Sequence, residues 1–239
     1  LTSFSYLLSL SLGGMFLILI FFLTRAGWSV VIRRVPEVLM NSIWVMALLF
    51  IPLLFGLHDL YHWTHAELLI PGTEKFDPIL AKKQGYLNVP FFIIRSVFYF
   101  LIWIWLARFF FRSSTQQDTQ DNKSLTLSMQ KRSTYGVLLY AITVSFASID
   151  WLMSLTPHWF STIFGVYFFA GSVVAALCFT SIAFCILRKI GYLNDIVTVE
   201  HFHDIGKLMY GFNVFWAYIS FCQYFLIWYS NIPEETEFF

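Results

Sequence analysis

One acidic residue of this 239-residue chain lies inside a long apolar stretch. Asp150 is the only charged residue between Tyr135 and Ser154, a stretch long enough to cross a lipid bilayer. A carboxylate at the bilayer centre costs roughly 2.5–3.5 kcal/mol on insertion scales, so such an acid usually has a partner or a function. His158 follows shortly after it, beyond a turn signal at Pro157. An acid and a histidine at one membrane edge suit a site that handles protons, or a molecule that carries protons.

A second charge, Arg95, lies at a depth similar to that of Asp150. It is about six residues inside an apolar stretch that begins near residue 89, which is roughly 10 Å at the helical rise. We expect the two side chains to approach within one intervening residue. The pair is then either a structural ion pair or a proton-accepting carboxylate whose pKa is balanced by burial and a nearby cation. In the second interpretation Asp150 carries the proton, Arg95 is its electrostatic partner and His158 is the exit.

Three histidines form another group of titratable side chains. His58, His62 and His65 have the spacing i, i+4, i+7, so that one helical face can present all of them beside Asp59 and Glu67. This spacing is compatible with a metal site, but proton uptake or release at the membrane edge is the favoured interpretation. We therefore expect no metal, and we take His58, Asp59 and His62 as weaker members of the same proton relay.

The elements that position these residues are predicted to be transmembrane helices. Hydrophobic residues make up 58% of the chain and charged residues 12%, against roughly 25% charged residues in soluble proteins. Apolar runs long enough to cross a bilayer recur along the whole chain. The prediction is an all-α, polytopic helical bundle of about six spans in one transmembrane domain, 1–239. The spans are expected at about 2–24, 37–57, 89–111, 133–155, 160–187 and 207–230.

Charge in the connecting loops predicts the orientation of this bundle. The loops 24–36, 108–132 and 188–207 are rich in arginine and lysine, whereas the alternate loops hold few basic residues, offset by acids. The positive-inside rule places the basic loops in the cytoplasm, with Leu1 and Phe239 on the outer side. The outer loop is about 58–89, with a short interfacial helix expected in HDLYHWTHAELL, and the inner polar loop is about 112–131. The chain begins at Leu1 instead of Met, and we expect it to be part of a longer subunit.

Polar and small residues recur at helical spacing inside three of the spans. These faces are expected to look inward, because polar side chains and close backbone contacts hold transmembrane helices together. The fourth span carries Tyr140, Thr143, Ala147, Asp150 and Ser154; the sixth carries Tyr210, Asn213, Ala217, Ser220 and Tyr224; the fifth carries the small pairs Gly171 with Ala175 and Ser172 with Ala176.

The sequence contains no pattern for a redox cofactor of its own. No histidine lies deep in a predicted span, so paired axial haem ligands are missing. The three cysteines lie in predicted spans without a C-x-x-C motif, and packing is their expected role. If the protein takes part in electron transfer, the cofactor belongs to a neighbouring subunit or the electrons travel on a quinol.

Three long stretches resemble one family of membrane subunits. They are AGWSVVIRRVPEV (26–38), SIDWLMSLTPHWFSTIFGVYFFAG (148–171) and VEHFHDIGKLMYGFNVFWAYISFCQYFLIWYSNIPEET (199–236). All three resemble the ActF-like subunit, or quinone-binding subunit 2, of alternative complex III, within the NrfD/PsrC-like superfamily. The resemblance implies a helical anchor without its own metal or haem, in the bacterial inner membrane.

The resemblance also implies the partners and the reaction. The family's complex oxidises quinol and passes electrons to a soluble cytochrome c or a terminal oxidase. The implied partners are an ActC-like anchor, an iron–sulfur subunit, and multihaem and monohaem cytochromes c, which hold the iron–sulfur clusters and haem c; lipid is a further partner and nucleic acid is not. Two other functions stay open: a non-catalytic structural anchor, and a secondary transporter, whose usual internal repeats and broken helices are not plain here.

Overall fold

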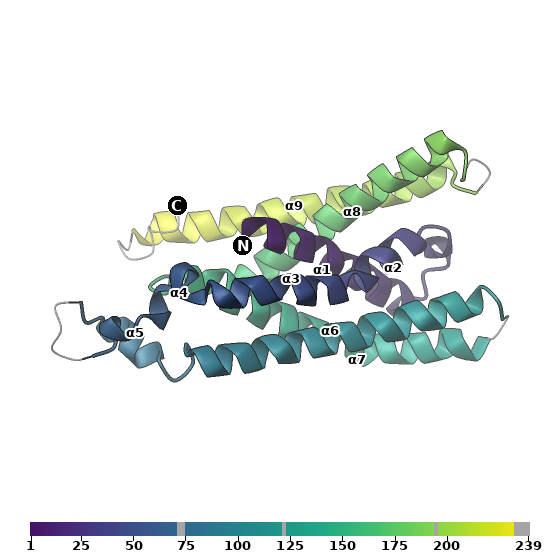
Figure 1. Ribbon diagram of the computed structural model, residues 1–239. Coiled ribbons are helices and arrows are strands. Elements are labelled where there is room, and N and C mark those ends of the chain that lie inside the picture. The colour runs from purple at the N-terminus through teal and green to yellow at the C-terminus, as the bar shows by residue number, and fades with distance from the viewer. Residues whose placement is uncertain (71–74, 121–122, 194–195, 232–239) are drawn as a thin grey trace.

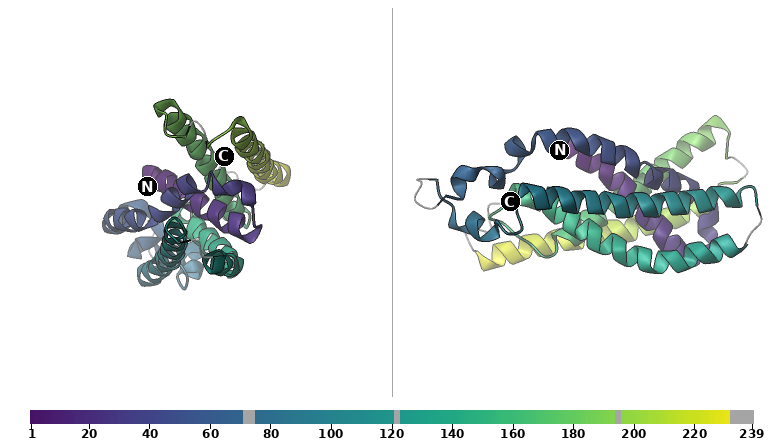
Figure 2. Two further views of the ribbon diagram at one scale, coloured as in Figure 1. Left: turned by 90° about the vertical axis from the view of Figure 1, so that its right-hand side faces the viewer. Right: turned by 60° about the horizontal axis from the view of Figure 1, so that its bottom comes forward.

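The protein is an elongated bundle of helices. The computed structural model describes residues 1–70, 75–120, 123–193 and 196–231, and in these residues the regular elements are helices without a strand (Figure 1). The predicted all-α class is confirmed. The long helices run roughly along one axis, as the two further views show (Figure 2). They are α1 (Thr2–Leu23), α2 (Arg34–Asn41) followed by α3 (Ile43–Phe55), α6 (Val89–Gln117), α7 (Lys123–Trp151), α8 (Phe164–Ile190) and α9 (Val199–Ser230).

Among the described residues, five helical segments are long and apolar enough to cross a membrane, which makes the chain a multi-pass membrane protein. They are α1, α2 together with α3, α6, α7 with the turn after it, and α8. The sixth expected span forms α9, which has 32 residues but does not reach the same apolarity in the described part of the chain. Asn213, Gln223 and several tyrosines lower its apolar content.

The two ends of the bundle differ in chemistry. One end, which we call the basic end, carries Arg33 and Arg34 at the start of α2, and Arg188 and Lys189 in the last turn of α8. The opposite end, which we call the loop end, carries the short helices α4 (Leu57–Leu60) and α5 (Pro78–Lys83) (Figure 1). The first residues of α1 and the last residues of α9 also lie toward the loop end. Phe239, expected outside with Leu1, falls outside the described residues.

Helices at the basic end continue beyond the expected membrane boundary. Most of the expected inner polar loop 112–131 is helical, because α6 runs to Gln117 and α7 already begins at Lys123. This stretch contains no glycine or proline, so both helices can extend into it before the turn after Gln117. The two extensions are joined by a hydrogen bond of 2.5 Å from Gln117 Nε2 to Thr126 Oγ1.

The expected interfacial helix in the outer loop is also wrong. The chain leaves α4 at Tyr61 and is extended again at His65, and only single 3₁₀ turns, His62–Thr64 and Ala66–Leu68, lie between and after these residues. Burial explains the break, since Tyr61 and Trp63 turn inward onto Phe92 of α6. The dipeptide Pro71-Gly72 also predicts a turn, which lies outside the described residues.

The core is built around α1, which packs against α2, α7 and α8. Its backbone approaches α8 so closely that a Cβ on Gly13 would lie 2.1 Å from the Ser172 carbonyl oxygen and 2.7 Å from the Ala176 Cβ. Ser172 and Ala176 are one of the small pairs in α8, and the close helix contact predicted there is confirmed. Glycine on the facing helix is what permits this contact.

Of the two polar stripes predicted to face inward, the one on α7 does so and the one on α9 does not. On α7 the inward orientation is confirmed, because Tyr140, Thr143 and Asp150 are each at most 2% exposed. On α9 it is wrong: Tyr210 is 74% exposed, and Asn213 and Tyr224 are exposed as well. The helix packs against α8 along another face, which buries Ile205, Ile219 and Ile227.

Candidate functional site

The candidate site is a buried ion pair near the loop end of the bundle. Asp150 lies in the last turn of α7 and is completely buried, and Arg95 lies in the second turn of α6. Arg95 Nε donates to Asp150 Oδ2 at 2.8 Å, and Nη2 donates to Oδ1 at 3.1 Å. The predicted approach of the two charges is confirmed, and the contact is direct and bidentate. Such bidentate pairs are among the strongest and most directional hydrogen bonds in proteins.

A tyrosine completes the hydrogen bonding of the carboxylate. Tyr99 is four residues after Arg95 on α6, so both side chains leave the same face of the helix. Its hydroxyl donates to Asp150 Oδ2 at 2.7 Å. The Ser154 hydroxyl donates to the backbone carbonyl of Asp150. The carboxylate therefore receives three hydrogen bonds, which is what a buried charge needs in place of water.

The guanidinium group of Arg95 is held from its other side. Its Nη1 donates to the backbone carbonyl of Tyr86 at 3.0 Å, and its central carbon lies 3.9 Å from the Tyr86 ring centroid and 4.3 Å from that of Phe91. Arg95 is thus fixed by α7 on one side and by aromatic rings on the other. The Tyr86 hydroxyl is buried and has no hydrogen-bond partner among the described residues. Burial, and then the negative charge of Asp150, raise the pKa of Tyr86, so this phenol stays protonated at neutral pH.

Aromatic side chains close the site toward the interior of the bundle. Trp151 donates from Nε1 to Ser96 Oγ at 2.9 Å, and its ring packs against Phe100 and Trp103. The Tyr61 hydroxyl donates to the Trp151 carbonyl at 2.9 Å. These contacts enclose the ion pair on the side of the bundle core.

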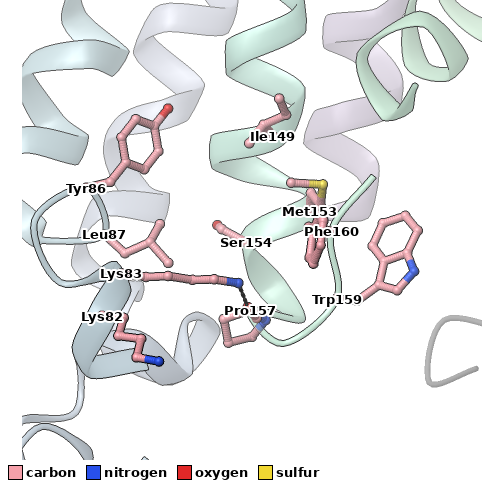
Figure 3. Close-up of a pocket in the computed structure, with 10 residues that line it drawn as sticks. All are labelled: Lys82, Lys83, Tyr86, Leu87, Ile149, Met153, Ser154, Pro157, Trp159 and Phe160. Carbon is pink, nitrogen blue, oxygen red and sulfur yellow. Dashed lines mark hydrogen bonds between the residues drawn. The ribbon is translucent and has the colours of Figure 1, made fainter. Parts of the chain in front are cut away.

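A pocket of about 540 Å³ lies beside the ion pair at the loop end (Figure 3). Tyr86 and Ser154 belong both to this pocket and to the surroundings of Asp150. Lys83 reaches across toward Pro157, while the Tyr86 hydroxyl points away from that lysine (Figure 3). The lining residues are Lys82, Lys83, Tyr86, Leu87, Ile149, Met153, Ser154, Pro157, Trp159 and Phe160.

His158, the expected proton exit, lies on the segment that forms one wall of this pocket. Its Nε2 lies 2.9 Å from Asp77 Oδ2, so its ionic partner is Asp77 and not Asp150. Asp77 also caps α5, accepting hydrogen bonds from the backbone nitrogens of Ile79 at 2.8 Å and Leu80 at 3.2 Å. His158 therefore ties the segment after α7 to α5, and its side chain is 40% exposed at the loop end.

The outer histidines gather without the helix that was expected to align them. The His65 ring lies 4.1 Å from the His58 ring and 5.9 Å from the His62 ring, measured between centroids, although the helix stops after α4. His58 contacts Thr64 Oγ1 at 3.4 Å, and Asp59 is exposed. In the part of the chain that the structure describes, no set of three histidine, cysteine or acidic side chains is arranged to hold a metal ion.

Sequence reasoning missed the other buried carboxylate, which lies near the basic end. Glu37 in α2 is completely buried and accepts hydrogen bonds from Ser114 Oγ at 2.6 Å and Arg34 Nη1 at 2.9 Å, with Arg33 Nε at 3.5 Å. The spacing i, i+3 and i+4 from the two arginines was a usable signal.

Tyr99 was also missed, although its spacing from Arg95 pointed to it. Tyr86 had no such signal, because a turn before α6 brings it to the site.

No protein-family model matches the chain, and a comparison with curated proteins finds no match either. The geometry of the site and the resemblance of the three sequence stretches are the remaining indications of function.

Proposed function

We propose that this protein is an integral membrane subunit of a respiratory quinol:cytochrome c oxidoreductase of the alternative complex III type, supporting quinol oxidation and proton transfer. The observation that carries the proposal is the completely buried Asp150, bound to Arg95 and Tyr99 beside a pocket at the loop end. An intramembrane carboxylate at the edge of a cavity is the usual mark of a proton pathway. Two of the three resembling stretches, 148–171 and 26–38, contain the two buried acids.

The orientation proposed for the subunit follows from its charges. The basic end faces the cytoplasm and the loop end faces outward, in a bacterial cytoplasmic membrane. Asp150 then lies near the outer face, where quinol oxidation in such a complex releases protons. The electrons go to iron–sulfur and haem c groups of partner subunits, and this chain contributes only proton-handling groups.

Each group of the site has a part in this scheme. Asp150 accepts a proton when its bond to Arg95 lengthens, because Arg95 stabilises the carboxylate as the anion. Tyr86, which stays protonated and has an unpaired hydroxyl, passes a proton on when it receives another. His158, exposed at the loop end, releases protons to water. The cluster of His58, Asp59 and His62 lies at the same end and serves as a second acceptor.

A structural anchor is the competing function, and one observation favours it. Both oxygens of Asp150 are already satisfied by Arg95 and Tyr99, so the group could serve only to join α6 to α7. Removing one partner of a buried pair costs about 3–5 kcal/mol because the other charge is left uncompensated. A structural role alone would thus also make the pair sensitive to mutation, and stability by itself does not separate the two functions.

Asp150→Asn in the full-length subunit, expressed in its host membrane, separates them. We expect the complex to assemble and its quinol:cytochrome c turnover to fall at least tenfold, because the amide cannot accept a proton, and Asp150→Glu to restore part of it. Assembly is followed by copurification of the haem-containing subunits, so that loss of the complex is distinguished from loss of turnover. Normal turnover in an assembled Asp150→Asn complex would refute the proton role and leave the anchor.

A further inference from the structure

Two lysines at the rim of the pocket have no part in the proton scheme. Lys82 and Lys83 lie in the last turn of α5, at the loop end of the bundle (Figure 1). Lys83 Nζ donates to the Pro157 carbonyl at 2.6 Å and lies 5.7 Å from the Phe160 ring centroid. Lys82 is exposed and forms no ion pair with the described residues.

The charge of Lys83 is not neutralised by the protein around it. The carboxylate that acts on it is Asp77, which is already committed to capping α5 and to His158. Burial lowers the pKa of Lys83, which means that its surroundings favour the neutral form. The Pro157 carbonyl offers the Lys83 ammonium group a dipole but no negative charge. An anion bound at this rim would neutralise the charge of Lys83.

On the side of the two lysines that faces the bundle, the pocket is apolar (Figure 3). Leu87, Ile149, Met153 and Phe160 form its sides, and the volume of about 540 Å³ is in the range of roughly 300–1,000 Å³ typical of ligand sites. Phe160 is 66% exposed beside Lys83, as expected of an aromatic side chain that meets lipid headgroups. A cationic rim above an apolar slot at the membrane edge matches a molecule with an anionic head and a hydrocarbon tail.

We infer that this pocket binds an anionic phospholipid of the leaflet at the loop end, with its phosphate at Lys82 and Lys83 and an acyl chain against Leu87, Ile149 and Phe160. Juxtamembrane lysines attract such headgroups strongly enough to select them over zwitterionic lipids. A quinol is the competing occupant, but it is neutral and gains little from two ammonium groups. The inference does not depend on the proposed redox function, because it concerns a bound lipid and not turnover.

The test uses the full-length protein, purified in a neutral detergent and stripped of lipid. Its thermal unfolding is followed while phosphatidylglycerol or phosphatidylcholine with the same acyl chains, inorganic phosphate or a short-chain quinol is added. We expect phosphatidylglycerol to raise the melting temperature at concentrations where the other three additives do not, because ligand binding to the native state stabilises it. Equal stabilisation by phosphatidylcholine, by phosphate alone or by the quinol would overturn the inference.

Variants locate the lipid on the protein. Replacing Lys82 and Lys83 together by Gln should weaken the apparent affinity for phosphatidylglycerol about thirtyfold. This is the change expected when the protein loses two lysine charges that attract the headgroup. Lys82→Gln alone should give about a fivefold loss and leaves the Lys83 contact with Pro157 in place, so folding is preserved. Lys75→Gln is the matched control, since Lys75 lies in the same outer segment but pairs with Glu67 and does not line the pocket. Unchanged affinity in the double variant, or an equal loss in the control, would overturn the assignment.

Discussion

The charge of Asp150 is maintained inside the bundle by donors from one helix face. Arg95 and Tyr99 are one turn apart on α6, and together they donate three hydrogen bonds to a carboxylate on α7. Its Nη1 donates to the backbone carbonyl of Tyr86, and the guanidinium group lies over the Tyr86 ring, so it has little freedom to turn away. Any proton transfer at Asp150 therefore begins with a change in the contact between Arg95 and Asp150. Removing the Tyr99 hydroxyl weakens the hydrogen bonding of the carboxylate while leaving the ion pair in place.

Tyr99→Phe should separate the hydrogen bond from the packing of the same ring. We expect a loss of about 1.5–3 kcal/mol in unfolding free energy, because the lost bond goes to a charged acceptor, and a clear fall in quinol:cytochrome c turnover. Tyr140→Phe is the matched control: its hydroxyl is equally buried but donates to the neutral Leu12 carbonyl at 3.0 Å. The control should lose only about 0.5–1.5 kcal/mol and keep its turnover. Both variants would be assayed by denaturation in detergent and by turnover in membranes; equal turnover in the two would count against the proton role of Asp150.

Part of the candidate site could be predicted from the sequence at the level of single residues. The matching depth of Arg95 and Asp150 in two expected spans was enough to predict their contact, because two lone opposite charges in lipid have few alternatives. The pairing of His158 with Asp77 was not predictable, since it depends on how the chain after α7 folds back onto α5. Nor was the pocket, because its walls come from two segments about 60 residues apart in the sequence.

At the level of helices, hydropathy located the membrane-spanning segments but not the helix ends or the faces that are covered. The helices α6 and α7 extend into 112–131, which holds no glycine or proline, and end there only at the turn after Gln117. The stripe on α9 was assigned inward by its polarity, yet α9 packs against α8 through Ile205, Ile219 and Ile227. Periodicity shows which residues share a face; which face is buried depends on the neighbours.

The contact between α1 and α8 can be tested by adding one methyl group. Gly13→Ala would place a Cβ 2.1 Å from the backbone oxygen of Ser172, and backbone on both sides cannot give way easily. We expect a loss of about 1–3 kcal/mol in unfolding free energy, as for other overpacked contacts. Gly211→Ala on α9 is the control, because nothing lies within 4 Å of its Cβ position. It should be neutral or stabilise by about 0.5–1 kcal/mol, since alanine is the better helix former. A harmless Gly13→Ala would show that the two helices are farther apart than described.

For the whole molecule the distribution of charge determines the function that can be proposed. The basic end and the loop end lie at opposite ends of one bundle, and Asp150, the pocket and His158 all lie toward the loop end. If the loop end faces outward, protons released at this site enter the space outside the cytoplasmic membrane directly. If it faced the cytoplasm, the same groups would serve proton uptake instead, so the orientation decides the direction of the chemistry.

Cysteine labelling in intact cells tests the orientation. In a background where Cys178, Cys185 and Cys222 are replaced by Ala, single cysteines would be placed at Gln84 on the loop end and at Thr119 on the basic end, both exposed. A maleimide that cannot cross the cytoplasmic membrane should label Gln84→Cys in cells with a permeabilised outer envelope, and Thr119→Cys only after the cytoplasmic membrane is opened. Charge asymmetry of the loops is the physical reason for this expectation. The reverse labelling pattern would place Asp150 near the cytoplasm and exclude proton release to the outside through His158, whereas equal labelling of both sites would mean that the protein inserts in two orientations.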